Sequence, residues 1–296
     1  MDKKKIAIIG AGVVGSAVGI ILKDHGYPIV GVASRSPASA ERLANRLHTT
    51  AYLSYARAAK LADLVFVTTT DSAIVTVVEE VAAVQAFHPG QIVVHMSGAL
   101  SSAVLAPAAR LGAIVLSIHP LQSFASVEQA IQNLPGSIFS IEGDPQGFTT
   151  AEELVRNLGG EFFFIDQRTK PLYHAGACVV SNYLVTLVDL GARLLESAGL
   201  PRQSAIKALL PLLEGTLRNI RNVGIPQALT GPIARGDVGT IRKHLSIMQE
   251  VEPELVDLYQ RLGYHTAEVA GRKGTINREQ IEELQTILSN TFTIKE

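Results

Sequence analysis

Three glycines at dinucleotide-turn spacing are the first residues whose arrangement could do chemistry. Gly10, Gly12 and Gly15 follow an apolar, strand-like run at 6–9 and open a helical pattern. In such a turn the first glycine permits the tight bend, the second lets the backbone approach a pyrophosphate, and the third permits close packing of helix on sheet. The amide groups at the start of the helix then face the phosphates. We therefore predict a dinucleotide site formed by Gly10, Ala11, Gly12, Val13, Val14 and Gly15.

The end of the next predicted strand indicates which dinucleotide binds. Enzymes that use NAD place an acidic residue here, about 20 residues after the glycines, to bind the ribose 2′-hydroxyl. This chain instead reads Ser34-Arg35-Ser36, and no acidic residue occurs between Asp24 and Glu41. A guanidinium flanked by hydroxyls suits a 2′-phosphate. We predict NADP rather than NAD, with a solvated loop charge as the alternative interpretation of Arg35.

Polar residues also follow the next predicted parallel strand. Thr68-Thr69-Thr70-Asp71 should line the same edge of the sheet, where ligands bind in open α/β folds. The simplest role for Asp71 is to cap the following helix, with a ribose contact as a second role. These four residues join the predicted cofactor site.

Two further strand ends carry polar groups in an apolar context, at His95-Met96-Ser97-Gly98 and at His119-Pro120. Both should open beside the nicotinamide ring. Hydride transfer to or from a carbonyl needs an acid/base at the substrate oxygen, and the unperturbed pKa of histidine suits that role. We predict His119 as the acid/base, Ser97 as a second group on the same oxygen, and Ser97 and Gly98 as cofactor contacts. The alternative for His119 is a turn residue that bonds the backbone.

A polar stripe occurs on a strongly apolar helical segment. His174, Cys178 and Asn182 recur at four-residue spacing and should therefore share one helix face, which must meet water or a site. Lys170 lies one spacing earlier, but Pro171 places it just before the predicted helix. We interpret Cys178 as a small core residue, because neither a helix N-terminus nor a neighbouring base is visible that would lower the pKa of its thiol.

A turn-rich loop at 229–237 supplies the last candidates. Arg235 could hold a substrate carboxylate through two hydrogen bonds. Asp237 could fix the geometry of Arg235 or cap the next helix. A simple loop ion pair is the alternative. The predicted catalytic set is therefore His119, Ser97, His174, Asn182, Arg235, Asp237 and Lys170.

These residues need two kinds of domain to position them. Up to about residue 165, short β-branched runs alternate with helical patterns, and fully apolar strands indicate a sheet covered on both faces. The fold class is α/β, an N-terminal Rossmann-like doubly wound parallel sheet followed by an all-α C-terminal domain. The predicted strands are 6–9, 29–33, 64–68, 92–95, 114–118, 137–141 and 162–165.

The second half changes to long helical periodicity. Helices are predicted at 171–198, 201–223, 238–248, 252–270 and 278–288. We therefore expect a cofactor domain at 1–167 and a helical substrate and dimerisation domain at 168–296. Its long apolar helices expose more hydrophobic surface than one small domain buries, which predicts a homodimer through this domain.

Composition limits the partners. The 296 residues are 47% hydrophobic with a net charge of −1, so we expect a small-molecule substrate and no nucleic acid. The single cysteine excludes a disulfide framework and a structural zinc site, so we expect no metal and a cytoplasmic location. An apolar run after Lys3, Lys4 and Lys5 has the outline of a signal peptide, but the glycine turn lies inside it. The stretch 175–190 is interrupted by polar residues, so we expect no membrane span.

With the glycine turn, the His-Pro strand end and the helical second domain, the chain resembles the two-domain dehydrogenase superfamily that includes 6-phosphogluconate and 3-hydroxyisobutyrate dehydrogenases, ketopantoate reductase, pyrroline-5-carboxylate reductase and prephenate dehydrogenase. Within it, Tyr173-His174-Ala175, Ser181-Asn182-Tyr183-Leu184 and the stretch from Gly231 to Asp237 look like signatures of a group that joins a Rossmann-like domain to a helical domain of unknown function. The resemblance covers about residues 4–290.

The resemblance implies an activity. Ser97 and His119-Pro120 resemble the Ser and His-Pro that prephenate dehydrogenases use at the substrate hydroxyl. The Lys and Asn of ketopantoate reductase are matched only at Asn182, which puts a lysine-based mechanism in doubt. We expect an NADP-dependent oxidoreductase that interconverts a small oxo acid, such as ketopantoate, and its hydroxy acid between the domains. His174 and Asn182 would orient the substrate and Arg235 would hold its carboxylate. The alternatives are a non-catalytic NADP-binding sensor or scaffold, and an imine reductase similar to pyrroline-5-carboxylate reductase.

Overall fold

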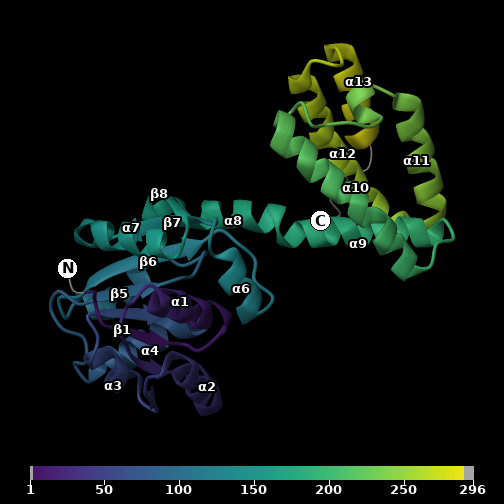
Figure 1. The fold of residues 1–296 in the computed structure, drawn as a ribbon. Helices are drawn as coiled ribbons and strands as arrows, with labels where there is room; N and C mark the ends of the chain where they lie inside the picture. The colour runs from purple at the N-terminus through teal and green to yellow at the C-terminus, as the bar shows by residue number, and fades with distance from the viewer. Residues whose placement is uncertain (1–2, 290–296) are drawn as a thin grey trace. The chain divides into compact units, whose positions relative to one another are not determined.

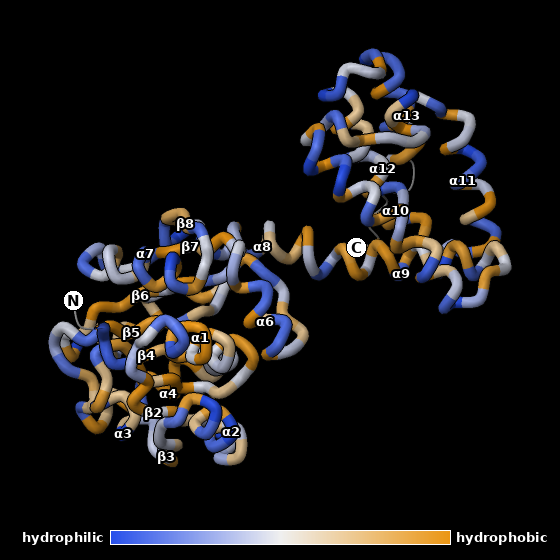
Figure 2. Tube along the Cα trace, viewed as in Figure 1, coloured by the Kyte–Doolittle hydropathy of each residue, from blue (hydrophilic) through white to orange (hydrophobic). Residues whose placement is uncertain are grey.

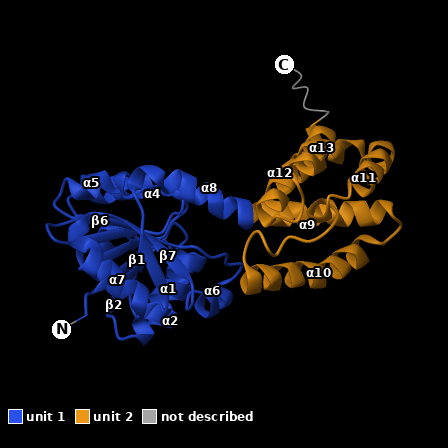
Figure 3. Cartoon of the chain, turned by 90° about the horizontal axis from the view of Figure 1, so that it is seen from above, with its two compact units in different colours: residues 1–181 blue, residues 182–296 orange. Residues whose placement is uncertain are grey.

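The computed structural model describes residues 3–289 (Figure 1). The chain divides into two compact units, which meet in the sequence between Ser181 and Asn182 (Figure 3). The first unit therefore extends beyond the predicted boundary at 167/168 and includes the first part of the helix predicted at 171–198. That difference matters for the site, because the helix brings Lys170, Tyr173 and His174 to the sheet.

The first unit is built on one eight-stranded sheet, in the order β3-β2-β1-β4-β5-β6-β7-β8. All neighbouring strands are parallel except β6 and β7. This order is that of a doubly wound fold, whose order reverses between β1 and β4, and it confirms the predicted fold class. The strands are β1 (Ile6–Ile9), β2 (Ile29–Ala33), β3 (Ala51–Tyr52), β4 (Leu64–Val67), β5 (Ile92–His95), β6 (Ile114–Pro120), β7 (Ile138–Gly143) and β8 (Glu161–Phe164).

Apolar layers cover both faces of this sheet, as the fully apolar strands predicted. One face packs against α1 (Val13–Asp24), α2 (Pro37–Leu47), α6 (Val127–Asn133) and α7 (Phe148–Asn157). The other packs against α3 (Tyr55–Lys60), α4 (Asp71–Ala83) and α5 (Ala106–Ala109). Short 3₁₀ turns lie at Ser102–Leu105, Pro145–Gly147 and Gln167–Thr169. The unit thus has the three layers that place strand ends at one edge.

The second of these faces turns polar toward β6 and β7. Ser117 on β6 lies directly opposite His95 on β5 and Glu142 on β7, and His119 lies opposite Ser140. Side chains two residues apart share a face, so these five form one polar patch beside the apolar core. Helix α8 (Lys170–Val180) contacts this patch, and Figure 3 shows α8 on the same side of the sheet as α4 and α5.

The second unit is helical, as predicted. It contains α9 (Asn182–Ser197), α10 (Arg202–Val223), a 3₁₀ turn (Ile233–Arg235), α11 (Val238–Val251), α12 (Pro253–Lys273) and α13 (Arg278–Ser289). Its main cluster of buried residues lies between α11, α12 and α13. One prediction is wrong: the segment 171–198 is not one helix, because α8 ends at Val180 and α9 begins at Asn182.

Large apolar side chains are exposed on α9 and α10. Val185 is 71% exposed and Leu212 is 67% exposed, and Ala205 is the only buried residue of α10. Hydrophobic residues also run along α8 into α9 (Figure 2). By length and composition alone, the stretch from Gln167 to Ser197 could cross a membrane, with 6% of its most apolar window buried. The prediction that this region is too short and too polar for a span therefore does not hold by that criterion.

Candidate active site

The glycine turn after β1 has the geometry that a dinucleotide site needs. Gly10 has φ of +111°, and a Cβ there would lie 2.6 Å from the Thr68 backbone. A Cβ on Gly15 would lie 2.2 Å from both the Gly10 carbonyl oxygen and Thr68 Oγ1. Helix α1 can therefore pack against this turn only if residue 15 is glycine. Around a Cβ at Gly12, in contrast, nothing lies within 4 Å. Two glycines are therefore required by packing, while the third opens free space.

That free space fits a pyrophosphate. Gly12 is the N-cap residue of α1 and has no side-chain capping bond, so the first amides of the helix are available to an anion. Val13 and Val14 begin the helix and pack against the apolar core with Ala11. The residues thus fit the predicted cofactor, with the turn held rigid by its own packing.

The three polar residues at the end of β2 differ from one another in their contacts. The Ser36 hydroxyl accepts a bond from the amide of Ser39 and caps α2. Ser34 is half-buried, and Arg35 is exposed with no hydrogen bond or ion pair to any residue in the described part of the chain. Arg35 is therefore free to meet a 2′-phosphate, and Ser36 has a structural role as well.

Asp71 corrects one prediction. The N-cap residue of α4 is Thr70, and Asp71 is the first residue of the helix. The Asp71 carboxylate accepts a 2.8 Å bond from Ser97 Oγ, and this oxygen in turn accepts bonds from the amides of Ala99 and Leu100. The Ser97 hydroxyl thus donates its proton to Asp71 and holds the loop after β5. Its first role is therefore structural, ahead of any bond to a substrate oxygen. Nearby, Thr68 Oγ1 donates to Gly10 O at 2.8 Å, and Thr69 Oγ1 is buried without a partner among residues 3–289.

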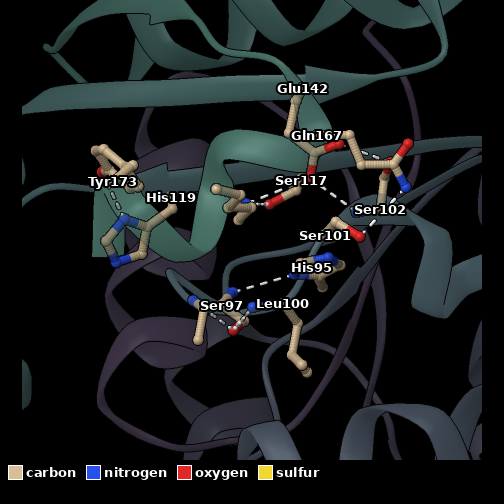
Figure 4. Close-up of polar contacts among 12 residues, drawn as sticks. His95, Ser97, Leu100, Ser101, Ser102, Ser117, His119, Glu142, Gln167 and Tyr173 are labelled. Carbon is tan, nitrogen blue, oxygen red and sulfur yellow. Dashed lines mark hydrogen bonds and ion pairs between the residues drawn. The ribbon is translucent and has the colours of Figure 1, made fainter. Parts of the chain in front are cut away.

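His119 lies at the centre of the site. Its Nδ1 lies 2.8 Å from the Tyr173 hydroxyl (Figure 4). A Cβ on Gly98 would lie 2.7 Å from His119 Nε2 and 2.7 Å from His174 Nδ1, so both ring nitrogens face the Gly98 Cα. His174 Nδ1 is buried and has no partner among the described residues, while its Nε2 lies 3.5 Å from Cys178 Sγ. Both rings therefore pack against Gly98, and only a glycine at this position leaves room for them.

Burial sets the charge state of these rings. Burial, the nearby Lys170 ammonium and His174 together lower the pKa of His119 to about 4. Burial and Lys170 likewise lower the pKa of His95, which is 0% exposed, to about 3. Both rings are neutral at physiological pH. A neutral imidazole at the end of β6 can accept a proton.

Lys170 is the first residue of α8 and is fully buried. It donates to Ser117 Oγ, and its Nζ lies 3.4 Å from Glu142 Oε1. The prediction that Lys170 precedes the helix is therefore wrong by one residue. The predicted catalytic role of Lys170 remains a prediction, and its burial points to the role argued below.

Three predicted residues belong to the second unit. Asn182 opens α9 and so does not share α8 with His174 and Cys178. Asp237 caps α11, accepting bonds from the amide and the hydroxyl of Thr240 at 3.0 and 2.6 Å. The Arg235 side chain is exposed and makes no hydrogen bond or ion pair within residues 3–289, while its charge helps to lower the pKa of Asp237. The capping role predicted for Asp237 is confirmed, and Arg235 stays the candidate for a carboxylate.

Tyr173, Ser117 and Glu142 are site residues that were not predicted from the sequence. Polar residues at every second position of β6 and β7, namely Ser117 with His119 and Ser140 with Glu142, were the available signal. In a strand whose other side chains are buried and apolar, such alternation indicates one polar face.

A doubly wound sheet with a glycine turn and polar strand ends defines the class, a Rossmann-like dinucleotide-binding domain. Two family models agree with this: residues 1–120 match a Rossmann-like domain, and residues 137–266 match a domain of unknown function, DUF2520. The two matches correspond to the two parts of the resemblance described above, a Rossmann-like domain joined to a helical domain of unknown function. No curated protein matches the chain.

Solved structures share this fold. Protein TM1727 of Thermotoga maritima is 26% identical with a TM-score of 0.72, and covers 90% of this chain and 99% of its own. A Bacteroides fragilis protein described as a candidate NADP oxidoreductase is 24% identical, with a TM-score of 0.71 and the same two coverages. A 1-pyrroline-5-carboxylate reductase of Streptococcus pyogenes is 19% identical with a TM-score of 0.61, covering 97% and 100%.

Proposed function

We propose that this chain is an NADP-dependent oxidoreductase that interconverts a small hydroxy acid and the corresponding oxo acid. The observation that carries the proposal is the pair of ring nitrogens, His119 Nε2 and His174 Nδ1, that both lie against Gly98. In an open α/β sheet, that point lies at the carboxyl ends of the strands, on the same edge as the glycine turn. The solved structures named as an NADP oxidoreductase and a pyrroline-5-carboxylate reductase have the same fold, which supports this class of chemistry.

NADP, when bound, supplies the hydride chemistry at its nicotinamide ring. In oxidation of the hydroxy acid, His119 accepts the hydroxyl proton as the carbon loses hydride. In the reverse reaction, the imidazolium returns that proton to the substrate oxygen. Tyr173 holds Nδ1 of the ring and thereby orients Nε2. His174, whose Nδ1 is buried beside Gly98, would help to orient the substrate.

The substrate's carboxylate calls for a cation. Within the first unit, Lys170 is buried against Glu142 and His119 is neutral, so neither offers a free positive charge. The roles predicted for Arg235 and Asn182, to hold and to orient the substrate, stay predictions, because both residues belong to the second unit. The oxo-acid class rests on that prediction.

The test is a single-turnover assay of NADPH oxidation across a panel of oxo acids, ketopantoate included. We expect at least one oxo acid to oxidise bound NADPH, and His119→Gln to slow that step by about 10²- to 10⁴-fold. NADPH that binds tightly but is consumed by no compound would instead support a non-catalytic sensor or scaffold. A His119→Gln variant that reacts as fast as wild type would overturn the role of His119.

Imine reduction is a second candidate, favoured by one observation. With its pKa lowered to about 4, His119 is a poor proton donor near neutral pH. An iminium substrate already carries its proton and needs no donor, unlike a carbonyl. Including cyclic imines in the same panel separates the two: turnover of imines alone, unaffected by His119→Gln, would replace the oxo-acid proposal.

A further inference from the structure

Lys170 is a charged side chain that no substrate could reach in this structure. The residue is 0% exposed and its ion-pair partner Glu142 is 2% exposed. Its ammonium bonds Ser117 Oγ and lies 3.4 Å from Glu142 Oε1. Burying an ammonium is costly unless it is paired, so its partners must be part of its role.

Those partners come from the rigid part of the molecule. Ser117 on β6 and Glu142 on β7 lie directly opposite one another, as Figure 4 shows. Glu142 also accepts bonds at 2.7 Å from the amide and the hydroxyl of Ser102, in the 3₁₀ turn after β5. Lys170 therefore ties the start of α8 to two strands and a turn.

The bonds of Lys170 lie one turn of α8 away from the residues that contact His119, the candidate acid/base. Tyr173 and His174 follow Lys170 by three and four residues, so they lie on the same side of α8. Ser117 precedes His119 by two residues on β6, so the two side chains share a face of the sheet. The bond from Lys170 to Ser117 thus fixes the start of α8. One turn further along the helix, the Tyr173 hydroxyl lies 2.8 Å from His119 Nδ1.

We propose that Lys170 is a positioning residue, whose bonds to Ser117 and Glu142 hold α8 against β6 so that Tyr173 and His174 are fixed against His119. The proposal rests on the proposed function only where it treats His119 as the acid/base. The buried ammonium has a second effect, because its charge opposes protonation of the His119 ring. The groups that act on His119 are Tyr173, His174 and Lys170 from α8 and His95 from β5.

The test uses a readout that does not need turnover. The nitrogen signals of His119 are followed by NMR against pH in wild type, in Lys170→Gln, and in the double variant Lys170→Met/Glu142→Gln, which removes both buried charges. Lys170→Arg keeps the charge. Lys60→Gln removes an exposed lysine of the same unit and serves as the matched control.

In the neutral variants we expect the pKa of His119 to rise from its value of about 4, and the Nδ1 signal to lose its hydrogen-bonded position. Lys170→Arg should retain the low pKa, and Lys60→Gln should match wild type. In the activity assay, the neutral variants should lose roughly 10- to 100-fold in kcat with little change in KM for NADPH.

A folded neutral variant whose His119 titrates and bonds as in wild type would overturn the proposal, even if no substrate is ever found. If turnover fails in wild type while the NMR shifts occur, the proposed function fails and the positioning role stands. Should neither neutral variant fold, Ser117→Ala is used instead, because it removes only the bond between Lys170 and β6. Displacement of the His119 Nδ1 signal in that variant is then the expected result, and an unchanged signal is the contradicting one.

Discussion

His119 connects burial to chemistry at the scale of single residues. Its ring is held at Nδ1 by Tyr173 and kept neutral by burial and by the Lys170 ammonium. Because the folded-state pKa of about 4 lies below the ordinary value of histidine, protonation occurs only under acidic conditions. The direction of the reaction therefore decides how rate depends on pH.

For oxidation of a hydroxy acid, the neutral ring is the active form. We expect kcat/KM to be level near neutral pH and to fall as the pH drops through about 4, because the base becomes protonated. In reduction the imidazolium is the donor, so the rate should rise as the pH falls toward 4. Stopped-flow measurements in both directions check the opposite signs. A reduction rate that falls on acidification would contradict this assignment.

Arg35 decides the cofactor preference. If its guanidinium binds the 2′-phosphate, Arg35→Ala should weaken NADPH binding by roughly 1.5–3 kcal/mol, the range for a hydrogen bond to a charged group, and leave NADH binding unchanged. Titration calorimetry with both cofactors measures the two affinities. Arg42→Ala, on the neighbouring helix α2, is the control. An unchanged ratio of the two affinities would make Arg35 a solvated loop charge.

Several residues of the site could be named from the sequence because strand ends in this fold meet at one edge. His119, Gly98 and the glycines lie there, and His174 joins them from α8. Ser97 and Asp71 were named, but their mutual hydrogen bond depends on how the loop after β5 meets α4. The Lys170, Ser117 and Glu142 network joins residues far apart in the chain, and no local pattern predicts that pairing.

At the scale of elements, the positions of strands and helices were predicted better than the way in which these elements pair with one another. The seven predicted strands all occur, but β3, only two residues long, carries too little pattern to be seen. The antiparallel direction of β7 was also outside local reasoning, since it depends on how the chain returns through α6. The break between α8 and α9 falls at Ser181, and no proline or glycine marks it, so helical periodicity alone merged the two helices.

The turn between β1 and α1 gives a prediction with an internal control. Gly15→Ala should destabilise the protein by about 1–3 kcal/mol, because its Cβ would overlap the Gly10 carbonyl. Gly12→Ala should leave stability nearly unchanged, since nothing lies within 4 Å, yet weaken NADPH binding strongly. Chemical denaturation and cofactor titration separate the two effects. Equal NADPH affinity in Gly12→Ala and wild type would place the pyrophosphate elsewhere.

At the scale of the whole molecule, the exposed apolar side chains of α9 and α10 form a surface that we expect a partner to bury. We propose a second copy of this chain, because a soluble monomer rarely exposes so much apolar surface. Leu212→Glu, at a side chain 67% exposed, should then produce monomers in light scattering, while Lys207→Glu on the same helix should not. A wild-type monomer, or wild-type protein that sediments with lipid vesicles through the apolar stretch from Gln167 to Ser197, would contradict the dimer.

The central claim is that the cofactor at the glycine turn exchanges hydride with a substrate held at His119. It is tested most directly with NADPH doubly deuterated at the nicotinamide C4, mixed with the panel of oxo acids and analysed by mass spectrometry. We predict a hydroxy acid that carries a single deuterium with wild-type protein, and a large loss of this product in His119→Gln. Failure of every oxo acid to acquire deuterium, or undiminished labelling in His119→Gln, would contradict the account.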